Sequence, residues 1–184
     1  QHPTGMMAGN YTVTITDANS CSATAVATVN NSSGPTVSPL TSTNLKCFGD
    51  NNGTAGVTAS GGKGGRNYSW STGGTAQTIT GLIANTYTVT VSDGSGCQVI
   101  STVSITQPNP LALTATALDA KCNGSCDGQA VVIPTANSGT APYSISWSTS
   151  STNLSISSLC AGPYSVTITD ANGCKKDSTV TVAE

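Results

Sequence analysis

A sequence segment that recurs three times limits the folds open to this chain more than any other feature. Each copy alternates apolar and hydroxyl residues and then has an aspartate, three small or polar residues and a cysteine. The copies are Asn10–Cys21, Thr86–Cys97 and Pro163–Cys174. Trp70 and Trp147 keep the same spacing, 77 residues apart. A unit of about 75 residues is too long for a solenoid repeat and has the length of a small domain.

The recurrence divides the chain into two complete units and a fragment. We expect complete repeats over 35–109 and 110–184, and we interpret residues 1–34 as the C-terminal hairpin of a truncated repeat. Two strands alone are marginally stable in water. We therefore expect the chain to be a piece of a longer protein.

Alternation with a period of two predicts strands throughout each unit. Strands are expected at Thr54–Ser60, Asn67–Ser71, Gln77–Leu82, Gln129–Ile133, Tyr143–Ser148 and Asn153–Leu159, with a leading strand before Cys47 and before Cys122. The chain has 55 Ser and Thr residues but one Glu, a composition that favours strands over amphipathic helices. The fold class predicted is all-β: tandem immunoglobulin-like antiparallel β-sandwich domains of six to seven strands each.

The aromatic residues are predicted to anchor the cores of these domains. Only 4% of the residues are aromatic, so a core can hardly spare its tryptophan for an exposed ligand-stacking surface. The predicted core anchors are Trp70, Trp147, Tyr11, Tyr87 and Tyr164.

Seven cysteines without a CxxC pair indicate disulfides in an oxidising compartment rather than a zinc site. Each complete unit has one cysteine near its start and one after its final turn, which predicts the pairs Cys47–Cys97 and Cys122–Cys174. The last unit gains two further cysteines together, which predicts Cys126–Cys160. Cys21 is left over, and its partner is expected outside the segment.

Three motifs, together with their counterparts, occur in this order: Cys47-Phe-Gly-Asp-Asn-Asn-Gly, Tyr68-Ser-Trp70-Ser and Asp170-Ala-Asn-Gly-Cys174. In combination they resemble the SprB repeat of Bacteroidota. The resemblance covers essentially the whole chain. It implies a large repetitive cell-surface protein exported by the type IX secretion system, since the family's namesake is the mobile adhesin of gliding motility. Similar repeats occur in other long secreted proteins.

Catalysis finds little support in the sequence, so we expect no enzyme and no catalytic residues. The single histidine, His2, lies outside any complete unit, and no Ser-His or Cys-His pair is available within a domain. Six basic against eight acidic residues leave no basic patch for nucleic acid. No apolar run is long enough to insert this segment in a membrane.

Two weaker kinds of site remain open. Asp17, Asn19, Asp170 and Asn172 offer oxygen ligands that could hold calcium, although turn capping explains the same residues; we expect no cofactor and no other metal. Asp177-Ser178-Thr179 resembles the O-glycosylation signal of Bacteroidota, with Ser178 as the acceptor.

The linkers Ser33-Gly-Pro35 and Thr106-Gln-Pro108-Asn-Pro110 are short and contain proline, which favours a stiff string of domains over a loose one. The leading hypothesis is a non-enzymatic segment of a secreted, cell-surface adhesin or extracellular fibre. Its expected partners are neighbouring repeats, other copies in a filament, and surface glycans or substrata. The alternatives are a filament subunit that assembles by strand complementation and a carbohydrate-binding module of a secreted protein.

Overall fold

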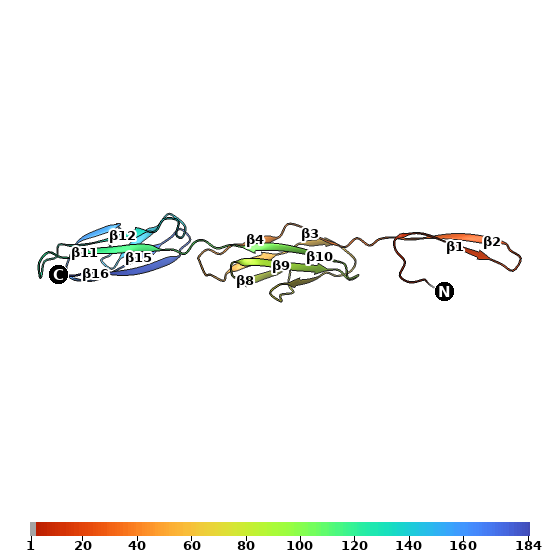
Figure 1. Ribbon diagram of the computed structural model, residues 1–184, viewed down its shortest axis with the longest axis horizontal. Coiled ribbons are helices and arrows are strands. Elements are labelled where there is room, and N and C mark those ends of the chain that lie inside the picture. The colour runs from red at the N-terminus through yellow and green to blue at the C-terminus, as the bar shows by residue number, and fades with distance from the viewer. Residues whose placement is uncertain (1–2) are drawn as a thin grey trace.

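The computed structural model describes residues 3–184 and consists of antiparallel strands joined by turns. Figure 1 shows three bodies in a row along the long axis: a hairpin, then the strands β3–β10, then the strands β11–β16. No helix occurs in the described range, and so no helix there could cross a membrane. The predicted all-β fold is confirmed.

The first repeat, residues 35–109, folds as two main sheets that face each other. One sheet has the order β4-β5-β8, the other has the order β10-β9-β7, and β3 pairs with β6. The strands are β3 Pro35–Val37, β4 Thr41–Thr43, β5 Gly53–Gly56, β6 Ala59–Gly61, β7 Asn67–Trp70, β8 Thr78–Leu82, β9 Asn85–Ser92 and β10 Gln98–Ile105. This repeat therefore has eight strands, one or two more than expected, and several of them are only three or four residues long.

The second repeat, residues 110–184, builds the same sandwich from six strands. Its sheets have the orders β11-β12-β14 and β13-β15-β16. The strands are β11 Leu113–Leu118, β12 Gly128–Pro134, β13 Ser144–Trp147, β14 Ser155–Leu159, β15 Gly162–Thr169 and β16 Lys175–Val182. In both repeats the last two strands form a long hairpin, because a left-handed glycine, Gly96 or Gly173, lets the aspartate turn close.

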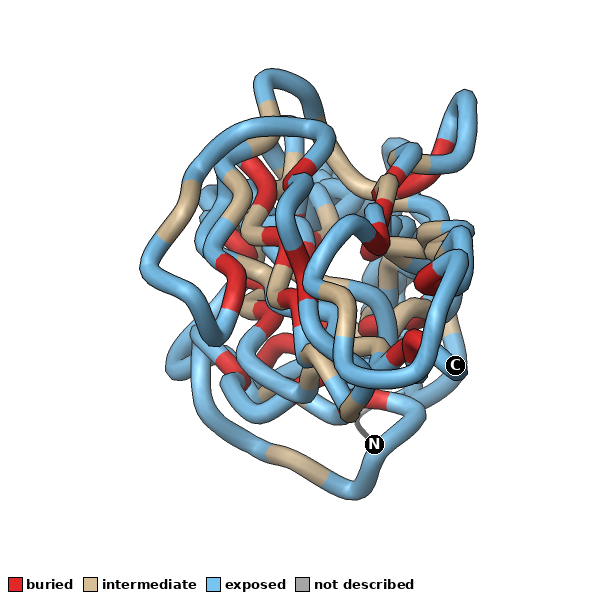
Figure 2. The backbone as a smooth tube through the Cα atoms, turned by 90° about the vertical axis from the view of Figure 1, so that its left-hand side faces the viewer, coloured by how far each residue is buried: buried red, intermediate tan, exposed pale blue. Residues whose placement is uncertain are grey.

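Each repeat has its own hydrophobic core. The clusters run from Leu45 to Ile105 and from Ala120 to Val182, and they share no residue. Figure 2, which looks along the long axis, shows the buried segments inside a ring of exposed loops. Trp70 and Trp147 are each 3% exposed, and each indole Nε1 donates a hydrogen bond of 2.9 Å to a backbone carbonyl. The tryptophans are therefore core anchors, as the sequence predicted.

The amino-terminal hairpin, residues 9–29, pairs β1 (Gly9–Thr16) with β2 (Ser22–Val29) in the same register that β9 and β10 adopt. Its apolar face is open. Val13 and Ile15 are 55% and 70% exposed, whereas their counterparts Val89 and Val91 are fully buried. Within residues 3–184 no second sheet covers this face.

Two expectations need correction because of this arrangement. The strand predicted at Thr54–Ser60 is two strands, since β5 pairs with β4 and β8 while β6 pairs with β3. Tyr11 is half-buried and belongs to neither core cluster, because its hairpin has no facing sheet. Tyr87 is a core residue, and Tyr164 is partly buried against the second core.

Candidate functional site: the junction between the repeats

The final turn of the second repeat is held by one buried carboxylate. Asp170 is 5% exposed, and its Oδ1 accepts hydrogen bonds of 2.9 Å from the amides of Asn172 and Cys174. Its Oδ2 accepts a third, also 2.9 Å, from the Thr140 amide. A short acidic side chain is required here because it must reach three backbone amides at once. The turn therefore presents Cys174 in a fixed position at the end of the repeat where the chain enters.

In the first repeat, Cys47 lies at the exit end, where the chain leaves the repeat for the linker. The Leu45 amide donates to the Thr106 carbonyl at 2.9 Å, and the Thr106 amide donates to Asn44 Oδ1 at 2.9 Å. The Gly49 amide also donates to Gln107 Oε1 at 2.9 Å. These bonds hold the Cys47 loop, residues 44–50, beside the linker to the second repeat.

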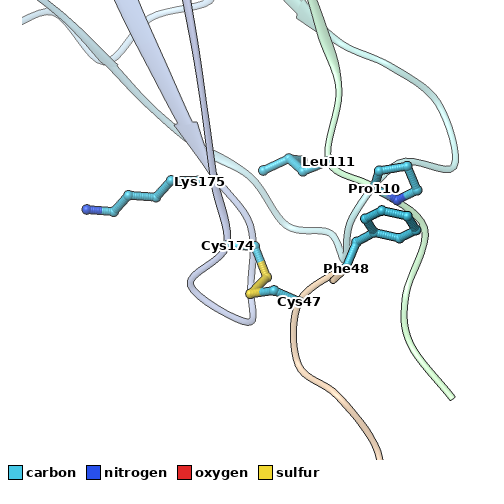
Figure 3. A pocket seen from close by; sticks show the side chains of 6 residues that line it. All are labelled: Cys47, Phe48, Pro110, Leu111, Cys174 and Lys175. Carbon is cyan, nitrogen blue, oxygen red and sulfur yellow. A yellow bond between two sulfur atoms is a disulfide. The ribbon is translucent and has the colours of Figure 1, made fainter. Parts of the chain in front are cut away.

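A disulfide between Cys47 and Cys174 joins the two repeats across the linker. The two Cα atoms lie 5.6 Å apart, although 127 residues separate them in the sequence. Figure 3 shows this bond between the exit loop of one repeat and the final turn of the next. The linkage is covalent, so the junction has two connections, the polypeptide and the disulfide.

The predicted pairs Cys47–Cys97 and Cys122–Cys174 are therefore wrong in this structure. Cys97 precedes β10 and the Cys47 loop adjoins the end of β10, so the length of this strand separates the two cysteines. Eight residues of strand span about 26 Å, far beyond the roughly 7 Å limit for a disulfide. The strand β16 separates Cys122 from Cys174 in the same way.

Polar contacts reinforce the junction beside the disulfide. The Asn172 side-chain amide donates to the Lys46 carbonyl at 3.0 Å and to Thr140 Oγ1 at 3.0 Å. In Figure 3 the Phe48 ring lies beside Pro110 of the linker, and the Lys175 side chain points away from the disulfide. The hollow that these residues line has a volume of about 230 Å³, below the roughly 300 Å³ of small-molecule sites. The junction is thus formed by the disulfide, the hydrogen bonds of Asn172 and the packing of Phe48 beside Pro110.

The third predicted disulfide, Cys126–Cys160, is present in the structure and closes a loop within the second repeat. Three cysteines of residues 3–184 form no disulfide: Cys21 and Cys122, which are exposed, and Cys97, which is half-buried. The partner predicted for Cys21 lies outside this segment, so that prediction stays open.

Two acidic residues have shifted ionisation. The pKa of Asp93, the counterpart of Asp170, is lowered chiefly by the hydrogen bond from the Lys63 amide, and burial opposes this effect. The pKa of Asp127 is lowered by the Lys121 amide and then by the Ser125 hydroxyl. Both carboxylates thus favour the charged form, in which they organise the turns that carry cysteines.

The aspartates that were predicted to bind calcium cap the turns in which they lie. Oδ1 of Asp17 and of Asp170 accepts the backbone amides of Asn19 and Asn172, respectively, as in capped turns. The described residues contain no group of three or more His, Cys, Asp or Glu arranged to hold a metal. Ser178 lies half-buried on β16, opposite Val166. His2 lies outside the described residues, and both the calcium and the glycosylation sites stay predictions.

Sequence reasoning missed three contributors to the junction: Phe48, the Lys46 carbonyl and the Asn172 side chain. A backbone carbonyl has no sequence signal. Asn172 was read as a turn residue or an oxygen ligand, and Phe48 has no aromatic counterpart, since Asn123 occupies its place in the second repeat. The isolated phenylalanine of an aromatic-poor chain, directly after Cys47, was the one available signal.

Comparison with known proteins finds a family match in each of the two complete repeats. Residues 40–75 and 114–152 match the SprB repeat family. No curated protein sequence matches the chain.

Among solved structures, the chain is similar to the N-terminal eight Ig domains of Down Syndrome Cell Adhesion Molecule isoform 1.30.30. The TM-score is 0.50 and the sequence identity is 13%, and the match covers 95% of this chain and 28% of that chain. It also matches Dpr2 Ig1-Ig2 in complex with DIP-Theta Ig1-Ig3, with a TM-score of 0.33, 15% identity, and coverage of 96% and 72%. The first of these likenesses shows an immunoglobulin-like fold.

Proposed function

Because the chain carries two SprB repeats, we propose that it is a non-enzymatic, load-bearing segment of a secreted, cell-surface adhesin or extracellular fibre. The observation that carries the proposal is the Cys47–Cys174 disulfide across the junction. Its effect is to fix the two domains to each other and to limit how far the chain extends under load.

The composition of the surface and the redox state fit an extracellular location. Disulfides persist in oxidising compartments and are rare in the cytosol. Only 8% of residues are charged, and hydroxyl residues fill the outward positions of the strands. The family suggests export by the type IX system of Bacteroidota and a role of the gliding-motility type. Neighbouring repeats are the immediate partners, and surface glycans or substrata are the proposed adhesion targets.

Surface labelling and flow detachment test this proposal in cells that make the full-length protein. An epitope tag in the β9–β10 turn should be accessible on intact cells and should disappear from the surface when the export system is disabled. At equal surface labelling, the Cys174→Ser variant should detach at lower shear than wild type. The exposed Ile100→Ala variant is the control and should detach as wild type does. A tag retained inside the cell would contradict the proposal.

The proposed segment needs no cofactor, because backbone amides already occupy the carboxylates of the final turns. Asp170 accepts three amides in all, which leaves it few lone pairs for calcium. Melting temperatures in excess EDTA and in millimolar calcium should therefore coincide. A calcium-dependent rise in the melting temperature would refute this part of the proposal.

A second candidate function, assembly by strand complementation, is favoured by the open face of the amino-terminal hairpin. Val13 and Ile15 are exposed there, and Pro3, Met6, Tyr11 and Val29 line an apolar hollow beside them. Strands from a neighbouring chain could cover this face as β5 and β8 face β9 and β10. Sedimentation should then show concentration-dependent association that Ile15→Asp abolishes and Ile100→Asp leaves intact. A monomer at all concentrations would rule this candidate out.

A further inference from the structure

The exit loop of the second repeat reproduces the exit loop that carries Cys47. The Ala120 amide donates to the Ala183 carbonyl at 2.9 Å, as Leu45 donates to Thr106. The Ala183 amide donates to Asp119 Oδ1 at 2.9 Å, as Thr106 donates to Asn44. Cys122 follows Ala120 by two residues, as Cys47 follows Leu45. Cys122 therefore occupies the position, relative to its own repeat, at which Cys47 forms the junction disulfide.

The final turns are equally alike. The Cys97 amide donates to Asp93 Oδ1 at 3.0 Å, and the Cys174 amide donates to Asp170 Oδ1 at 2.9 Å. Cys97 also lies where the chain enters its repeat. A Cβ atom added to Gly34, just before the repeat begins, would lie 3.3 Å from the Cβ atom of Cys97. Each complete repeat thus has one cysteine at its exit and one at its entry.

We propose that Cys122 is a junction cysteine, which forms a disulfide with the final-turn cysteine of a further SprB-type repeat docked at the exit of the second repeat. The evidence is an occupied copy of the same site within this molecule, the Cys47–Cys174 bond. Cys122 is exposed, as a residue that meets a partner must be. The inference rests on the same junction geometry as the proposed function, but the two can fail separately: an unpaired Cys122 beside an intact Cys47–Cys174 bond would refute the inference and leave the proposed function standing.

The hydrogen bond of Asn172 across the junction indicates which final turns can dock beside Cys122. Asn172 donates to the Lys46 carbonyl, and the equivalent carbonyl beside Cys122 belongs to Lys121. A partner turn with asparagine two residues before its cysteine can make this hydrogen bond again. Asn123 replaces Phe48 beside the linker, so the second junction lacks the aromatic contact and relies on the turn and the disulfide.

Bond formation is a two-electron oxidation. Each thiol loses one proton and one electron, the two sulfur atoms join, and the electrons reduce a small-molecule disulfide such as oxidised glutathione to two thiols. The Asp127 carboxylate accepts hydrogen bonds from the Lys121 amide at 3.0 Å and from Ser125 Oγ at 2.7 Å. These bonds order the loop around Cys122 before the partner binds.

The test extends the full chain by a copy of its own second repeat. Residues 108–184 are appended after Glu184, which reproduces the natural linker from Pro108 onward. In the copy, Ala171→Gly distinguishes the turn peptide from the original, and Cys122→Ser removes the copy's own exit cysteine, so that every Cys122 peptide comes from the original repeat. The protein is oxidised with glutathione, its free thiols are alkylated, and its peptides are mapped without reduction. We expect Cys122 bonded to the copy's Cys174, with alkylation lost at Cys122 and retained at Cys21 and Cys97.

Two variants and a denatured sample serve as controls. Cys122→Ser in the original repeat should leave the copy's Cys174 alkylated, and Cys97→Ser should change no pairing. Oxidation in guanidinium should scramble the pairs, which shows that the folded junction selects them. Alkylated Cys122 in molecules that contain the Cys47–Cys174 bond would overturn the proposal. So would pairing of Cys122 with Cys21 or Cys97, or the absence of both junction disulfides.

Discussion

Pulling the ends of the chain apart should reveal the junction disulfide as a limit on extension. A force applied at the termini passes from Cys47 to Cys174 through the sulfur–sulfur bond, so the 127-residue separation between them carries no tension. An extended chain gains about 3.3–3.6 Å per residue, and the bond therefore withholds about 420–460 Å of length. Both repeats lie largely within the protected stretch.

The variant Cys174→Ser releases most of this length. The Cys126–Cys160 bond, with a separation of 34 residues, still withholds about 110–120 Å, so the variant should extend about 310–335 Å further than wild type. Full reduction should add the remaining length. The assay is single-molecule force extension with handles at both termini, in which worm-like-chain fits give the contour length of the oxidised chain, the variants and the reduced chain.

The variant Cys122→Ser is the control for this measurement. Cys122→Ser should extend no further than wild type, because Cys122 forms no bond in this chain. If Cys174 were instead bonded to Cys122, Cys174→Ser would lengthen the chain by only about 60 Å. A gain of that size, or a longer chain with Cys122→Ser, would refute the interrepeat bond.

Two further predictions concern the individual repeats. Trp147→Ala should lower the free energy of unfolding of the second repeat by about 3–5 kcal/mol in denaturant titrations, because the side chain is 3% exposed, whereas Ile100→Ala should cost less than about 0.5 kcal/mol. Equal effects would contradict the assigned core. For Asp93, the folded pKa lies below the usual 3.8, so its contribution to stability is present above that value and is lost as the pH falls through the folded pKa. Acid titration of Asp93→Asn should therefore show a flatter stability profile below about pH 4 than wild type; an unchanged profile would refute this role.

The sandwich fold could be predicted because its signals are local. Alternation with a period of two specifies which face of each strand is buried, and Val89 and Val91 are fully buried as that pattern requires. Trp70 and Trp147 are the largest apolar side chains of an aromatic-poor chain, so their burial also follows from composition. Cys126–Cys160 was predictable because the two cysteines appear together in one repeat only.

The junction could not be predicted because it depends on which end of a repeat each cysteine occupies. The spacing shows that Cys47 corresponds to Cys122 and that Cys97 corresponds to Cys174, but it does not place them in space. The hydrogen bond of Leu45 to Thr106 places the Cys47 loop at the exit, and it joins residues far apart in sequence. The sequence prediction assumed that each repeat pairs its own cysteines, whereas the structure links a cysteine of one repeat to a cysteine of the next.

The most direct test of the account is a disulfide map of the oxidised 184-residue chain. Cleavage after lysine and before aspartate places Cys47 and Cys174 on separate short peptides, and mass spectrometry without reduction identifies the partner of each. We expect a peptide pair that joins Cys47 to Cys174 and alkylated thiols at Cys97 and Cys122. Peptide pairs that join Cys47 to Cys97 and Cys122 to Cys174 would contradict it.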